Sequence, residues 1–248
     1  MIDLRLQSAV PRDIGLWEWF SDPETWTDPD TGIFVSLVDT ITLCLAVMAI
    51  SVLIAVPLGA GLGHLRKGEL TATWVVNIGR ALPTFAVAGL LVPIALRRGW
   101  GFEPWPILIA LVLLALPPIY LNTHTAVRQS NTGAVEAARA MGFSERDVLF
   151  RVELALGAGL ILAGIRIAAV QVVATEPLRA YFGGDGLGRY VRDGLGQNND
   201  TLLIGGAILV ATLAVSTGLL LSLLERVALP SGVRRLRVSR PRQTRGAQ

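Results

Sequence analysis

Few residues of this chain could bind a nucleotide, and none forms a recognisable nucleotide site. Lys67 is the only lysine among the 248 residues and is followed by Gly68. An ATP-binding phosphate loop needs Ser or Thr after its lysine. The segment 183–188, Gly-Gly-Asp-Gly-Leu-Gly, has the wrong spacing for a dinucleotide fingerprint, so we interpret it as a tight turn whose glycines adopt positive φ. The sequence predicts that any ATP and Mg²⁺ are bound by another subunit.

Residues suited to catalysis or metal binding are isolated from one another. His64 and His124 have no carboxylates beside them at metal-ligand spacing, and we interpret both as histidines at a membrane interface. Cys44 is the single cysteine and lies in an apolar run, which excludes a disulfide framework and a cysteine-based metal site. The sequence contains no set that resembles a Ser-His-Asp triad. It therefore predicts a protein that is not an enzyme and holds no cofactor or metal of its own.

Arg80 lies inside an apolar run, where a charged side chain is costly unless it faces protein or water. Asn77, Arg80 and Thr84 share one helical face, and Pro83 loosens the backbone between them. We interpret this face as lining a translocation path or a seam between subunits. The alternative is that Arg80 only extends to the near membrane surface.

Arg166 is a second arginine in an apolar run and lies closer to its middle. The pairs Gly159–Ala163 and Gly164–Ala168 surround it and allow close contact between helices. We expect Arg166 to bind a backbone carbonyl or a polar group on a neighbouring helix. We assign Arg166, Gln171 and Thr175 to the translocation path. Gln171 and Thr175 either add hydrogen bonds there or serve packing alone.

Long apolar segments position these residues. The chain is 52% hydrophobic and only 17% charged, whereas soluble domains carry about a quarter charged residues. A membrane-crossing helix needs about 20 apolar residues. The segments that qualify are Thr40–Leu62, Trp74–Leu96, Trp105–Val127, Leu154–Thr175 and Thr201–Leu224. We predict an all-α membrane protein with five transmembrane helices; Pro117–Pro118 leave open a re-entrant third segment.

Basic residues predict the orientation. Arg and Lys are more numerous in the loops after the first and third segments and in the C-terminal tail than in the N-terminal tail and the loops after the second and fourth segments. Basic loops face the cytoplasm, so the N-terminus lies outside a cell (plasma or inner) membrane and the C-terminus inside. Residues 1–35 then form an extracytoplasmic segment, residues 36–226 a five-span domain and residues 227–248 a basic cytoplasmic tail. We interpret this tail as a topology anchor; the alternative is that it is attracted to anionic lipid of the bilayer. Nucleic-acid binding is not expected of so short a tail beside a membrane.

The cytoplasmic loop between the third and fourth segments predicts two short helices. Thr132 is a plausible N-cap, Gly142 a left-handed terminator, and Ser144 with Asp147 a second capping box. The second helix should continue into the fourth segment. A simple linker needs no such helix pair, which favours a surface that docks into a partner.

The loop residues carry a resemblance to a known family. Glu136-Ala137-Ala138, followed by Gly142 and by Val152-x-Leu154, resembles the EAA loop of type I ABC-importer permeases. Further segments resemble the glycine betaine/choline (osmoprotectant) uptake permeases: 81–84, 153–154, 163–166, 183–188 and 198–199. One departure is Ala155, where the family pattern has proline, and this should join the second loop helix smoothly to the fourth segment.

The resemblance implies a permease subunit of an ATP-driven importer of compatible solutes such as glycine betaine, choline, carnitine and proline betaine. It implies two ATPase subunits, a second permease chain, identical or paralogous, and an external substrate-binding protein. The residues that it assigns to ATPase coupling are Glu136, Ala137, Ala138, Gly142, Phe143, Val152 and Leu154. The alternatives are a stand-alone channel, a secondary transporter, or an ABC permease for another small solute such as an amino acid.

Overall fold

The computed structural model describes residues 14–66, 83–101 and 104–228. Within these ranges the chain forms helices and turns and no strand, as the apolar segments predict. Two residues of the predicted translocation face, Asn77 and Arg80, lie outside the described residues.

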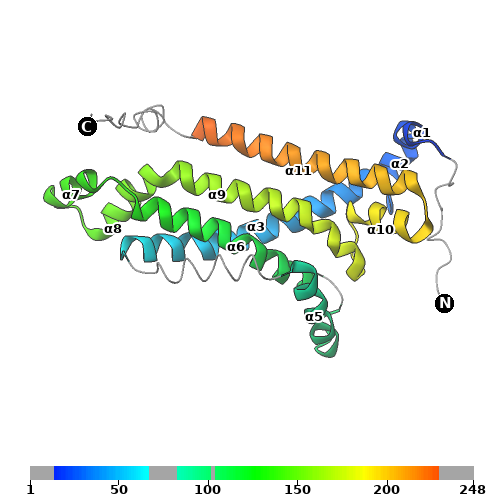
Figure 1. Ribbon diagram of the computed structural model, residues 1–248, viewed down its shortest axis with the longest axis horizontal. Helices are drawn as coiled ribbons and strands as arrows, with labels where there is room; N and C mark the ends of the chain where they lie inside the picture. Colours follow the sequence, from blue (N-terminus) through cyan, green and yellow to red (C-terminus); the bar gives the residue numbers. More distant parts are fainter. Residues whose placement is uncertain (1–13, 67–82, 102–103, 229–248) are drawn as a thin grey trace, which may run out of the picture.

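Among the described residues, four helices are long and apolar enough to cross a membrane. They are α3 (Ile33–His64), α6 (Trp105–Arg128), α9 (Leu154–Thr175) and α11 (Asp200–Ala228). The helix around α9 is longer than the predicted segment, because a π-helical turn (Val148–Glu153) precedes it and a 3₁₀ helix (Glu176–Phe182) follows it. Figure 1 shows α6, α9 and α11 along the long axis of the molecule, with α3 crossing behind them.

The second predicted segment is only partly described. Its later half forms α5 (Thr84–Arg97), a shorter apolar helix that packs against α6 and projects from the bundle in Figure 1. Pro83 is the N-cap of α5 and Thr84 is its first residue. The ring of Phe85 lies 4.9 Å from that of Phe182, so this end of α5 rests against the 3₁₀ helix that follows α9.

Glycines let α3 and α9 approach α6 closely. A Cβ on Gly59 of α3 would lie 2.9 Å from the carbonyl oxygen of Tyr120, and one on Gly63 would lie 2.9 Å from that of His124. A Cβ on Gly164 of α9 would lie 2.6 Å from Cβ of Asn122. Small residues at such spacing remove the side-chain layer between helices, which makes α6 the centre of the bundle.

The two ends of the bundle carry different short helices (Figure 1). Helices α7 (Thr132–Ala140) and α8 (Glu145–Asp147) lie at the end where α11 finishes. Helices α1 (Leu16–Ser21), α2 (Pro23–Thr27) and α10 (Gly188–Gln197) lie at the opposite end. Trp19 of α1 is buried against Gly205 of α11, so the described part of the N-terminal segment is packed onto the bundle.

Candidate functional site: the α7–α8 loop and the polar clusters of the bundle

Asn131, not Thr132, caps α7. The side chain of Asn131 accepts a hydrogen bond of 3.0 Å from the backbone N–H of Ala134, while Thr132 is already the first helical residue. The prediction was one residue late, because both residue types are good caps and only the backbone conformation separates them.

Gly142 ends α7 as predicted. Its φ is +85°, and its N–H donates to the carbonyl of Arg139 at 2.9 Å. The N–H of Phe143 donates to the carbonyl of Ala138 at 3.1 Å. These two bonds form a Schellman motif, which satisfies the last carbonyls of the helix and turns the chain sharply.

The second loop helix is continuous with α9. Ser144 accepts a hydrogen bond from the N–H of Asp147, which starts α8. Hydrogen bonding to Ser144 and the nearby guanidinium of Arg151 lower the pKa of Asp147. The helix then passes through the π-helical turn into α9, and Ala155 lies inside it without a break. The smooth junction predicted from the missing proline is confirmed.

A small apolar core holds α7 against the start of the long helix. Its buried residues are Val135, Ala138 and Val148, and Val152 packs against them. Two of the predicted coupling residues, Ala138 and Val152, therefore face inward, and Leu154 is half-buried.

Glu136, Ala137, Gly142 and Phe143 form the exposed surface of the loop. Met141, which the sequence analysis did not select, adds an apolar side chain that is 70% exposed. Its position at the end of α7, beside the turn at Gly142, is a signal that could have identified it.

An ionic chain crosses the loop. Arg139 of α7 binds both carboxylate oxygens of Glu145, at 2.9 and 2.8 Å. This pairing lowers the pKa of Glu145 and raises that of Arg139. His64 at the end of α3 contacts Glu145 and also Glu153.

Both histidines lie near helix ends, and both contact protein groups that the sequence did not indicate. His64 joins three helical segments through its ion pairs. His124 is buried inside the α3–α6 contact and stacks on Tyr120 at 5.8 Å. Sequence could not show this, because the partners of both rings lie on other turns or other helices.

Arg166 pairs with a polar group on a neighbouring helix, as expected. Its guanidinium lies 3.2 Å from a carboxylate oxygen of Glu225 in α11. Gln171 is exposed and Thr175 is half-buried. From Arg166 to Thr175 the chain rises about 13 Å along the helix, so the Arg166 pair and the Thr175 end are separate places on α9.

A buried polar cluster occupies the end of the bundle opposite α7. Thr40 of α3 donates to Glu176 at 3.2 Å and accepts from the N–H of Leu187 at 3.0 Å. Arg179 binds Asp39 and lies 3.3 Å from Glu176. We call Asp39, Thr40, Glu176 and Arg179 the outer cluster. Their long-range contacts tie α3 to the 3₁₀ helix that follows α9.

The glycine-rich segment packs onto the outer cluster. Gly183 and Gly186 have φ of +87° and +88°, as predicted for a tight turn. A Cβ on Gly186 would lie 2.6 Å from the hydroxyl oxygen of Thr40. Glycine is required there both for the backbone conformation and for the close approach.

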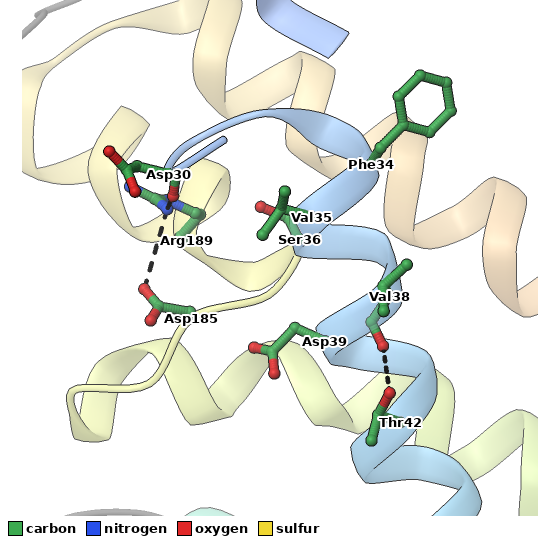
Figure 2. A pocket seen from close by; sticks show the side chains of 9 residues that line it. All are labelled: Asp30, Phe34, Val35, Ser36, Val38, Asp39, Thr42, Asp185 and Arg189. Carbon is green, nitrogen blue, oxygen red and sulfur yellow. Dashed lines mark hydrogen bonds and ion pairs between the residues drawn. The ribbon is translucent and has the colours of Figure 1, made fainter. Parts of the chain in front are cut away.

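An open pocket of about 630 Å³ lies beside the outer cluster, as Figure 2 shows. Its apolar wall comes from Phe34, Val35 and Val38 of α3. The polar residues around it are Asp30, Ser36, Asp39, Thr42, Asp185 and Arg189. The guanidinium of Arg189 lies 3.9 Å from the carboxylate of Asp185. The lining of the pocket carries more carboxylates than guanidinium groups, and Arg179 of the outer cluster offsets the charge of Asp39.

The family model for the inner membrane component of binding-protein-dependent transport systems matches residues 51–230. The chain belongs to this family. The match includes α6, the α7–α8 loop, α9 and α11, so the loop described above is part of a transport permease.

Several relatives of this permease in sequence are named for choline, glycine betaine or carnitine transport. It is 34% identical to the choline transport system permease protein OpuBB of Bacillus subtilis (strain 168). The alignment covers 79% of this permease and 88% of that protein. It is 30% identical to the glycine betaine/carnitine/choline transport system permease protein OpuCB of the same organism. That alignment covers 77% of this permease and 86% of OpuCB. A carnitine transport permease protein of Listeria monocytogenes is 32% identical, and the alignment covers 79% of this permease and 87% of that protein.

The fold also matches solved structures. A chain of the methionine ABC transporter MetNI, in an inward-facing conformation, aligns with a TM-score of 0.68 and 19% identity. The alignment covers 79% of this permease and 95% of that chain. At this identity the likeness establishes the all-helical permease fold alone.

Proposed function

We propose that this chain is a membrane permease subunit of an ATP-driven importer for quaternary ammonium compatible solutes, the class of glycine betaine, choline, carnitine and proline betaine. The observation that carries the proposal is the α7–α8 loop, an ordered helical hairpin whose exposed face is held rigid by its own apolar core. The family match and the names of the relatives support the same function.

The exposed face of α7 is the docking surface for the ATPase in this proposal. Glu136, Ala137, Met141 and Phe143 would contact the ATPase subunit directly. Ala138, Gly142, Val152 and Leu154 would act by holding that face in place. Two ATPase subunits, one for each permease chain, would bind ATP and Mg²⁺.

The remaining partners follow from the orientation that the basic residues predict. With the N-terminus outside, the end with α1, α2 and α10 faces an external substrate-binding protein. α11 leaves Val215, Leu219 and Leu223 exposed, which suits lipid or a second permease chain. The translocation path would be lined by Asn77, Arg80, Pro83, Thr84, Arg166, Gln171 and Thr175.

The Arg166–Glu225 pair changes the argument about substrate charge. A lone Arg166 would repel a bare cation and would favour a zwitterion such as betaine over choline. Because Glu225 offsets this charge, the pair gives no such preference. The carboxylates around the outer pocket also suit a cationic group. The proposal therefore covers both choline and betaines.

The test is transport by the assembled importer in proteoliposomes loaded with ATP. We expect uptake of labelled glycine betaine or choline that needs ATP, the ATPase subunit and the external binding protein. The permease alone should hydrolyse no ATP. ATP-independent flux would point to a channel or secondary transporter, and uptake of an amino acid in place of these solutes would overturn the substrate class.

A further inference from the structure

His64 contacts two carboxylates at the end of α3. Its Nδ1 lies 2.6 Å from Oε2 of Glu153, and its Nε2 lies 3.2 Å from Oε2 of Glu145. The side chains of His64 and Glu153 are only 13% and 8% exposed, so water competes weakly for the shorter contact. Glu145 is in turn held by Arg139 of α7. One imidazole thus links α3 with α8 and with the π-helical turn before α9.

The geometry specifies the charge state that satisfies both contacts. A neutral imidazole has one N–H donor, and its other nitrogen would place a lone pair against a carboxylate oxygen. The imidazolium has two N–H donors, one for each carboxylate. His64 is also the last residue of α3, where the partial negative charge of the helix C-terminus favours a cation.

The other charged groups near His64 lie on four neighbouring elements, α6, α7, α8 and the π-helical turn. Glu145 and Glu153 contact it directly, and Arg139 reaches it through Glu145. Helix α6 brings His124 and Arg128 to the same end of the α3–α6 pair, where the His124 carbonyl lies against Gly63. The two contacting carboxylates are therefore the direct partners of the ring.

Helix α3 connects this contact to the opposite end of the molecule. From Thr40 to His64 the helix spans about 36 Å. At its far end Asp39 and Thr40 bind Arg179 and Glu176 of the outer cluster. The same helix therefore contacts the α7–α8 loop at one end and the buried groups beside the outer pocket at the other.

We propose that His64 is a positioning residue for energy coupling. As an imidazolium it fastens the α7–α8 loop to α3, so that movement of α7 on the ATPase moves α3 and the outer cluster with it. This inference rests on the proposed docking of α7 on the ATPase. It predicts that coupling weakens when the ring is replaced by a side chain that cannot donate to both carboxylates.

The test compares three variants of the assembled importer in proteoliposomes. His64→Gln removes the charge and leaves a single amide group facing two carboxylates. His64→Arg keeps several N–H donors and a positive charge, and so tests whether a conservative replacement restores coupling. Arg151→Gln is the matched control, because it removes the exposed pair with Asp147 in the same segment and leaves the His64 contacts intact. The measurements are labelled glycine betaine carried per ATP hydrolysed and the Tm of each purified permease in detergent.

We expect His64→Gln to lower the substrate carried per ATP about tenfold, which corresponds to losing a hydrogen bond to a charged group. His64→Arg should retain coupling, and Arg151→Gln should follow the wild type. The Tm of His64→Gln should lie below that of the wild type, and the Tm of His64→Arg should lie near it. Wild-type coupling in His64→Gln, or a loss in His64→Arg as large as that in His64→Gln, overturns the inference. A wild-type importer that carries no substrate would refute the proposed function, while the Tm comparison would still decide whether the His64 contact exists.

Discussion

Gly142 offers a direct test of the α7–α8 loop, because the structure separates backbone strain from crowding at this position. Its φ is +85°, yet a Cβ added there would meet no atom within 4 Å. Any cost of substitution therefore comes from the left-handed backbone. For a residue with a Cβ this cost is about 1–2 kcal/mol, and it is smaller for Asn or Asp, whose short polar side chains tolerate the conformation.

The informative series is Gly142→Asn, Gly142→Ala and Gly142→Val. A penalty of about 1–2 kcal/mol lowers the population of the Schellman turn relative to alternatives by about 5- to 30-fold. ATP-driven uptake should therefore fall least in the Asn variant and most in the β-branched Val variant. An Asp substitution adds a charge to the docking face as well, so it tests both effects at once.

The assay is initial uptake by the assembled importer, divided by the amount of permease in the membrane as measured by immunoblot. Gly61→Ala is the control, because Gly61 lies within α3 and a Cβ there also meets no atom within 4 Å. Full uptake by the Val variant would show that the turn geometry does not matter for coupling. Equal losses in the Asn and Val variants would show that strain is the wrong explanation.

Three further predictions concern stability and pH. Gly164→Val should destabilise the α6–α9 contact by about 1–3 kcal/mol through overpacking, measured as a lower Tm in detergent, with Gly61→Ala unchanged. Thr40→Val should lower the free energy of unfolding by about 1–3 kcal/mol, because the substitution leaves a buried backbone N–H without its acceptor; an unchanged Tm would show that this bond is replaced. The pKa of Glu145 is lowered from 4.5, first by its hydrogen bonds to Arg139, so the pair contributes fully above pH 4.5 and is lost as the pH falls through the lowered value. The protection of α7 amides against exchange, relative to their intrinsic rate at the same pH, should fall in that acidic range, and protection that stays constant there would contradict the assignment.

The class of protein and the α7–α8 loop could be predicted from sequence because their causes are local. Apolar runs of about 20 residues specify membrane-crossing helices whatever their neighbours are. Gly142 terminates α7 through bonds to residues a few positions earlier, and Ser144 starts α8 by capping Asp147. The exception, Asn131 in place of Thr132, is a shift of one residue between two good capping types.

Which side chains face one another was decided only by the tertiary structure. His64 and Glu153 are 89 residues apart in sequence, and Thr40 and Glu176 are 136 apart. Periodicity along one helix indicates which residues share a face, but it does not indicate which helix that face meets. Ala138 turned inward and Met141 outward for the same reason, because only the packing of α7 on Val148 fixes the rotation of this short helix. Sequence thus determined the helices and the turn between them, while close packing through glycines set the long-range ion pairs that connect the two ends of the bundle.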